Sequence, residues 1–225
     1  MRRELNDMAR FDAADSALTA QLISQAAAGD KEAWGRLLAE HRDRLRRMVA
    51  LRLDHRLQGR IDASDVIQDA FIDASRCLAE YIQNPALPFF LWLRFLTGIR
   101  LAKLHRYHLG TQMRDAGREI SLYRGLMPET SSAALAAQLL GRDNRPSEFA
   151  MRAELKLQLQ EAINAMDPLD REIIALRHFE QLTNSEAAQL LEITEAAASK
   201  RYIRALERLR DILVRLPGNI GDLLP

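Results

Sequence analysis

The side chains best suited to chemistry in this chain are a group of cations near its carboxy terminus. Lys200, Arg201, Arg204 and Arg208 are spaced so that they share one face of a helix. Such a face can lie between the two phosphate backbones that border a DNA major groove. The solvated face of an ordinary helical hairpin would give the same pattern, so the neighbouring elements have to decide between the two interpretations.

Two capping patterns place these cations in a helix-turn-helix. Thr183 and Glu186 have the T-x-x-E spacing of a capping box, which predicts a short helix that ends near Leu191. Thr194 can cap a second, longer helix, and this order of elements is the arrangement that binds the major groove. The turn residue Glu192 costs about 1 kcal/mol if the turn needs the positive φ angle that glycine adopts without strain.

Carboxylates form a second group. Asp65, Asp69 and Asp73 follow one stripe of a helix, and like charges at this spacing repel by roughly 0.2 to 0.5 kcal/mol per pair. A basic partner opposite the stripe would remove this repulsion. The partner can lie outside the chain, or it can be the preceding segment 36–60, which holds eight arginines.

A third group combines aromatic rings with cations. Phe89 and Trp92 are followed along the same predicted helix by Arg100, Lys103 and Arg106. Rings can stack on unpaired bases while cations hold the backbone of single-stranded nucleic acid. Phe89 and Trp92 at this spacing also fit an apolar core, which is the commoner role of such residues.

The elements that position these groups are predicted to be helices. Apolar residues recur at spacings of three and four and nowhere alternate strictly, so the expected fold class is all-α. We expect helices over residues 16–28, from Asp30, from Asp62, over 89–107 and over 147–166, with a restart at Asp167-Pro168. The prolines of the segment 84–88 predict a loop.

Two helical domains joined by a flexible linker, the second a helix-turn-helix, are the expected architecture. Periodicity weakens over residues 110–146, where Gly, Ser, Pro and Thr collect, although SAALAAQLL within this linker can form a short helix. The expected divisions are an amino-terminal extension with a first helix at 1–29, a first domain at 30–109, the linker at 110–146, the helix-turn-helix domain at 147–216 and a tail at 217–225.

Composition argues against several classes of protein. The 32 basic and 31 acidic residues nearly balance, so net charge alone indicates neither nucleic-acid nor membrane binding. No run of about 18 apolar residues occurs and Cys77 is the only cysteine, so we expect no membrane partner and a reducing, cytoplasmic location. His105 and His108 lack a matching acidic or cysteine cluster, and no Gly-rich phosphate loop occurs; we therefore expect no metal, no cofactor and no catalysis.

From Asp30 to Arg215 the sequence resembles the bacterial RNA polymerase sigma factors of the sigma-70 family, in their extracytoplasmic-function (ECF) group. GDKEAWGRLLAEHRDRLRRMV resembles the first helix of the family's region two, and SDVIQDAFIDA resembles the segment that holds the polymerase clamp. PFFLWLRFLTGIRLAKLHR is similar to the stretch that melts and reads the −10 element. MDPLDREIIALRHFEQLTNSEAAQLLEITEAAASKRYIRALERLR resembles region four, which reads the −35 element.

The resemblance implies roles for particular residues. Asp65, Gln68, Asp69 and Phe71 fall on the family's D-x-x-Q-E-x-F clamp-binding pattern, with Asp69 in place of the usual Glu. The implied −10 contacts are Asn84, Phe89, Trp92, Arg100, Lys103 and Arg106, and the implied −35 contacts are Thr194, Ser199, Lys200, Arg201, Arg204 and Arg208. The chain departs from the family at Glu192, which replaces the usual turn Gly, and at Ile99, where many members have Asn.

The function that the resemblance implies is that of a dissociable promoter-specificity subunit without catalysis of its own. It would bind the clamp coiled coil and the flap of core RNA polymerase, recognise the two elements in double-stranded promoter DNA and help to melt it. An anti-sigma protein is a further candidate partner. The alternative is a stand-alone helix-turn-helix regulator, which has no need of the acidic stripe.

Overall fold

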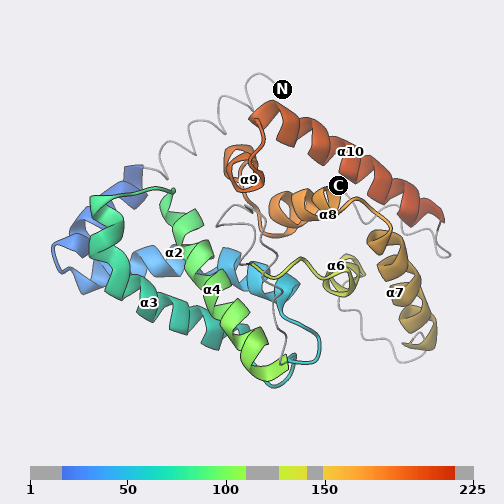
Figure 1. The fold of residues 1–225 in the computed structure, drawn as a ribbon, viewed down its shortest axis with the longest axis horizontal. Coiled ribbons are helices and arrows are strands. Elements are labelled where there is room, and N and C mark those ends of the chain that lie inside the picture. The colour runs from blue at the N-terminus through green and yellow to red at the C-terminus, as the bar shows by residue number, and fades with distance from the viewer. Residues whose placement is uncertain (1–16, 110–126, 141–148, 216–225) are drawn as a thin grey trace.

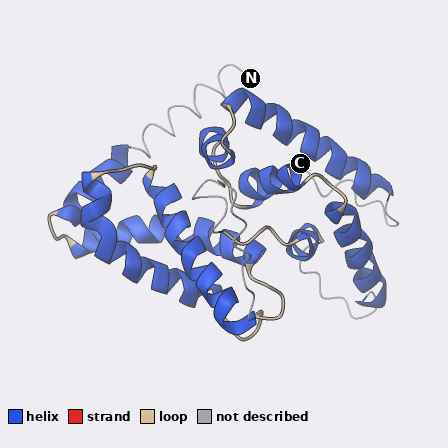
Figure 2. Cartoon of the chain, in the orientation of Figure 1, coloured by secondary structure: helices blue, strands red, loops and turns tan. Residues whose placement is uncertain are grey.

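The computed structural model describes residues 17–109, 127–140 and 149–215 of the 225-residue chain. Within these ranges every regular element is a helix and no strand forms (Figure 2). The predicted all-α fold class is therefore confirmed. No helix in the described ranges is both long enough and apolar enough to cross a membrane.

A helix over residues 17–27 precedes the labelled elements, and Ser16, where it was predicted to begin, lies outside the described residues. The labelled helices are α2 (Lys31–Arg52), α3 (Ala63–Gln83), α4 (Phe89–Leu109), α6 (Ser132–Leu139), α7 (Phe149–Asn164), α8 (Pro168–Ile174), the π-helix η2 (Ala175–Phe179), α9 (Asn184–Leu191) and α10 (Glu195–Arg215).

Helices α2, α3 and α4 pack together as the amino-terminal lobe (Figure 1). The side chain of Asp30 caps α2 by accepting hydrogen bonds from the backbone N–H groups of Glu32 (2.9 Å) and Ala33 (3.1 Å). Asp62 caps α3 in the same way, through the N–H of Ser64 (2.8 Å). Both helices therefore begin where the sequence predicts. Their shared core is apolar, with Leu37, Leu45, Met48, Ile67, Leu93 and Leu101 almost fully buried.

Helices α7 to α10 form the carboxy-terminal lobe. Asp167 caps α8 and Pro168 is its first residue, as the sequence predicts, because proline needs no N–H partner at this position. Helix α8 continues into η2, a π-helix that the apolar pattern does not indicate. Helix α10 packs on α8 and α9 and runs along the outer edge of the molecule (Figure 1).

Helix α6 lies within the predicted linker and joins the two lobes. It packs mainly on α7 and also contacts α2. Just before it, the backbone N–H of Ser131 donates to the carbonyl oxygen of Leu51 at 3.0 Å. This part of the linker is therefore folded, as the short-helix prediction anticipated, whereas residues 110–126 and 141–146 lie outside the described residues.

Candidate functional site

The helix-turn-helix has the local geometry that the sequence predicts. The hydroxyl of Thr183 accepts a hydrogen bond from the N–H of Glu186 (3.1 Å), and the Glu186 carboxylate accepts one from the N–H of Thr183 (2.8 Å), which completes a capping box. Thr194 accepts from the N–H of Ala197 (3.2 Å) at the start of α10. Glu192 has a φ of 55°, so the turn does use the left-handed conformation.

The predicted basic residues all lie on α10, but two of them have internal partners. Arg201 Nη1 donates to Asp170 Oδ1 at 2.7 Å, and Arg208 Nη1 pairs with the other oxygen of the same carboxylate. Lys200 and Arg204 are exposed and form no ion pair within the described residues. The four cations line one groove with Asp167, Asp170 and Ala197.

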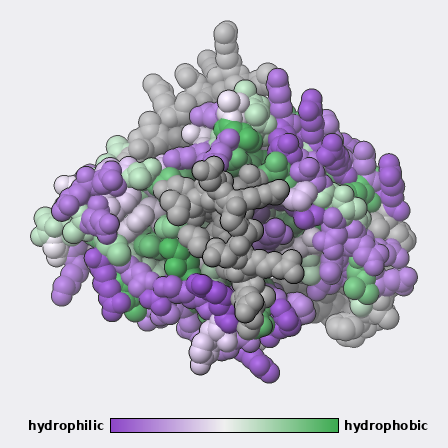
Figure 3. Space-filling model, viewed as in Figure 1, coloured by the Kyte–Doolittle hydropathy of each residue, from purple (hydrophilic) through white to green (hydrophobic). Residues whose placement is uncertain are grey.

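Of the remaining −35 candidates, Thr194 lies directly before α10 and Ser199 lies on it, and both are exposed. Hydrophilic side chains gather along the edge of the molecule where α10 lies (Figure 3). The four cations thus share the groove, while Thr194 and Ser199 are exposed outside it. Asp170 was not among the predicted site residues, because an acid in the first turn of α8 gives no sign of a partner more than 30 residues away.

The acidic stripe of α3 divides into an exposed part and a paired part. Asp65, Gln68 and Asp69 are exposed, and neither carboxylate has an ion-pair partner within 4 Å among the described residues. Phe71 is half-buried and packs against the core. Asp73 instead accepts two hydrogen bonds from Arg100 of α4, one of them 2.5 Å from Nη2, and these lower the pKa of Asp73.

These positions bear on two expectations. The internal partners of the acidic stripe are Arg100 of α4 and, at 3.9 Å, Arg76 of α3 itself, and not the arginine-rich segment 36–60; both reach only Asp73. Arg100, one of the expected −10 contacts, is therefore already held by a carboxylate.

The other −10 candidates lie at different depths. Asn84, Lys103 and Arg106 are exposed. Trp92 is half-buried and stacks on Tyr81 with 4.5 Å between ring centroids. Phe89 is only 4% exposed and belongs to the core, so its ring is not presented to DNA in this conformation, which agrees with the alternative interpretation of its spacing.

The histidine pair has a structural explanation. The Nε2 atom of His105 accepts a hydrogen bond from the backbone N–H of Asp54 at 3.2 Å, which ties α4 to the end of α2. Burial lowers the pKa of His105, which favours the neutral ring that this acceptor role requires. No cluster of metal-ligating side chains occurs among the residues that the structure describes.

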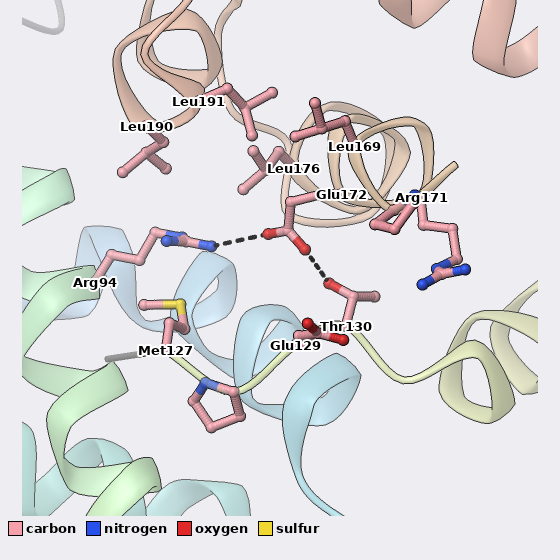
Figure 4. Close-up of a pocket in the computed structure, with 12 residues that line it drawn as sticks. Arg94, Met127, Glu129, Thr130, Leu169, Arg171, Glu172, Leu176, Leu190 and Leu191 are labelled. Carbon is pink, nitrogen blue, oxygen red and sulfur yellow. Dashed lines mark hydrogen bonds and ion pairs between the residues drawn. The ribbon is translucent and has the colours of Figure 1, made fainter. Parts of the chain in front are cut away.

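A buried ionic cluster joins the lobes, and the sequence did not reveal it. Arg52 and Arg94 of the amino-terminal lobe pair with Glu180, and the bond from Arg94 Nε measures 2.8 Å. Arg52 also pairs with Glu172, whose carboxylate accepts from the Thr130 hydroxyl at 2.7 Å. Figure 4 shows Arg94, Glu172 and Thr130 around a pocket between the lobes. Burial by itself would raise the pKa of Glu172, but the charges of the two arginines and the Thr130 hydrogen bond hold it below its ordinary value.

Comparison with known proteins agrees with the helix-turn-helix assignment. The family model described as Sigma-70, region 4 matches residues 156–209. The ECF RNA polymerase sigma factor SigD of Mycobacterium tuberculosis is 28% identical over 193 residues, which cover 86% of this chain and 82% of SigD. The RNA polymerase sigma factor CnrH of Cupriavidus metallidurans is 28% identical over 196 residues, which cover 85% of this chain and 92% of CnrH.

A solved structure of CnrH in complex with the cytosolic domain of CnrY aligns with 89% of this chain and 97% of that one, at 22% identity and a TM-score of 0.48. The region 4 match covers the helix-turn-helix, so this part of the chain is similar to region 4 of the sigma-70 family. Over most of its length the chain is similar to these ECF and related RNA polymerase sigma factors, at 28% identity.

Proposed function

We propose that this protein is an ECF sigma factor and that it binds core RNA polymerase through the exposed acidic surface of α3, formed by Asp65, Gln68 and Asp69 with Phe71 beside them. The observation that carries the proposal is that Asp65 and Asp69 stay exposed and without an ion pair in the described structure, although the neighbouring helices are rich in arginine. Carboxylates with no internal partner on a stripe of like charge are best explained by a basic partner outside the chain.

The promoter contacts follow from the two lobes. The exposed cations of α10 would bind the −35 element, with Thr194 and Ser199 beside them. The exposed loop residue Asn84, together with Lys103 and Arg106, would hold the −10 element as it melts, and Trp92 would form the wall of that site. Such a subunit works where the polymerase works, so we expect it in the cytoplasm, and the proposal assigns no catalytic step to it.

The decisive experiment is co-purification with core polymerase followed by run-off transcription. The variant that combines Asp65→Lys with Asp69→Lys should lose core binding, because the change reverses the charge of the exposed surface, and its thermal unfolding should stay close to wild type. The control combines Asp43→Lys with Glu80→Lys, two exposed acids of the same lobe, and changes the net charge equally.

Wild-type core affinity in the α3 variant would contradict the proposal, as would an equal loss in the control. A stand-alone regulator is the other candidate function. Such a regulator would protect a symmetric operator from nuclease in the absence of polymerase. The α3 substitutions would not change that protection.

A further inference from the structure

We infer that Asp170 is a positioning residue for −35 recognition, because it holds Arg201 and Arg208 of α10 in place and leaves Lys200 and Arg204 free. The inference rests on the proposed function, since it assumes that α10 faces promoter DNA. It adds a residue on a different helix, whose side chain would act on DNA only through the arginines that it orients.

The carboxylate is built into the lobe. The Asp170 side chain is 4% exposed, whereas those of Arg201 and Arg208 are 35% and 59% exposed. One oxygen accepts from Arg201 at 2.7 Å and the other pairs with Arg208, so both oxygens are used. Asp167 adds a longer contact of 3.4 Å to the same nitrogen of Arg201. Because the acceptor Asp170 is buried and its two donors are more exposed, Asp170 holds Arg201 and Arg208 in place rather than being held by them.

The consequence for Arg201 is pre-organisation. A guanidinium has five N–H donors, and the two bonds to the acids of α8 use only Nη1. The donors on the other nitrogens stay available while the planar group is held in one orientation. An arginine fixed in this way loses less conformational entropy when it forms a bidentate contact with a base edge.

The other two cations, Lys200 and Arg204, have a different role from Arg201. Lys200 and Arg204 have no acidic partner in the described structure, so their side chains can adapt to phosphate positions. Phosphate contacts supply affinity and salt dependence without sequence information, whereas a fixed bidentate arginine discriminates between bases. Arg201 is therefore the base-reading residue, and Asp170 sets its orientation.

The test uses holoenzyme reconstituted with the full chain and a promoter library randomised over the −35 element. We expect the wild type to select a preferred sequence, and Asp170→Asn to reduce the preference at the Arg201-dependent position by about tenfold, within the range that a bidentate contact supplies. The slope of log affinity against log salt should steepen by about one, because a freed guanidinium can contact phosphate.

Glu207→Gln is the matched control, since it removes one negative charge from an exposed position on α10 itself. It should leave the base preference unchanged. Equal effects of the two variants on preference, or an unchanged preference in Asp170→Asn, would overturn the inference. A wild-type holoenzyme with no preference in the −35 region would instead contradict the proposed function.

A double-mutant cycle covers the case in which Asp170→Asn merely loosens the packing of α8 on α10. Arg201→Lys keeps the charge but lacks the planar donor set, so it should lose the same preference. If Asp170 acts through Arg201, the double variant should show no further loss. Additive losses would mean that Asp170 acts by another route and would overturn the inference. If Asp170→Asn does not fold, Asp170→Glu replaces it in the cycle with the same expected non-additivity.

Discussion

Glu192 shows how a single backbone angle can be foreseen from sequence. The turn of a helix-turn-helix favours a left-handed residue, and Glu192 adopts a φ of 55° there. We expect Glu192→Gly to stabilise the protein by about 0.5 to 1 kcal/mol, because glycine adopts this angle without strain. Urea unfolding measures the change.

Glu195→Gly provides the comparison for this turn. Glu195 is in the first turn of α10, where the backbone is right-handed, so glycine should there destabilise the protein by up to about 1 kcal/mol. A destabilised Glu192→Gly variant would show that the side chain of Glu192 contributes more than its backbone angle costs.

The pKa of His41 predicts how the free energy of unfolding changes with pH. Its side chain lies in the core beside Phe89 and Phe90, with ring centroids 5.6 Å away from each. Burial, and secondarily the charge of Arg44, lower its pKa from 6.5 to about 4. Between these two values the unfolded chain binds a proton that the folded chain does not, so stability falls as pH falls through this window.

His41→Leu should remove most of this acid sensitivity. The contribution of His41 amounts to about 3 kcal/mol between pH 7 and pH 4, at 1.36 kcal/mol per pKa unit. Burial lowers the pKa of His105 and His178 as well, so a smaller slope of the same sign should remain. Urea midpoints measured from pH 4 to pH 7 give the slopes, and equal slopes for both proteins would show that His41 is not the group that titrates.

At the scale of single elements, the capping box of α9 ties local structure to the contact between the lobes. Glu186 accepts from the N–H of Thr183 and also pairs with Arg44 of α2 at 2.6 Å. We expect Thr183→Ala to cost about 1 kcal/mol in urea unfolding, because the N–H of Glu186 loses its acceptor. Thr183→Ser keeps the hydroxyl and should stay near wild type; a similar loss in both variants would point to the methyl group instead.

Elements were predictable because their signals are local. Asp30, Asp62, Asp167 and Thr183 cap helices through bonds to residues two or three positions away, and the apolar spacing reports the buried face directly. The π-helix η2 was not predictable in this way, since its extra residue per turn leaves no distinct apolar pattern.

The candidate surfaces were predictable only as sets of charges. Their spacing placed Asp65 and Asp69 on one face, but it could not say that Asp73 would be taken by Arg100 or that Asp170 would hold Arg201. An ion pair between distant segments needs only two opposite charges, and 63 basic and acidic residues allow very many such pairs. The choice among them depends on tertiary packing.

At the scale of the whole molecule, the lobes are held together by charges removed from water. The side chains of Arg52 and Glu180 are fully buried where the lobes meet, and Arg94 completes the cluster. Buried charges are tolerated when each has its partners, but they cost several kcal/mol when one partner is lost. Helix α10 lies outside this contact, along the outer edge of the molecule (Figure 1).

The same cluster bears on how two lobes could bind one promoter. If the whole predicted linker 110–146 were a flexible coil, it would average roughly 30 to 36 Å end to end, which is enough for separate docking but requires α6 to leave α7 and α2. Separate docking would return Arg52, Arg94 and Glu180 to water and break their bonds. The free-energy cost of separating the lobes would make the free energy of binding to polymerase less favourable.

Glu180→Gln should therefore open the molecule without unfolding the lobes. The change leaves two buried arginines with Glu172 as their remaining carboxylate, which should destabilise the closed arrangement by about 3 to 5 kcal/mol. The substitution removes no apolar side chain, so helix content measured by circular dichroism should stay constant while the radius of gyration from small-angle X-ray scattering increases. Core polymerase should bind this variant more tightly, because the cost of separation has been removed.

Arg47→Ala is the control, since its 2.7 Å bond to Gln181 also crosses the lobes but is exposed and contributes little. An unchanged radius for Glu180→Gln, or an equal increase for Arg47→Ala, would show that the buried cluster does not hold the lobes together.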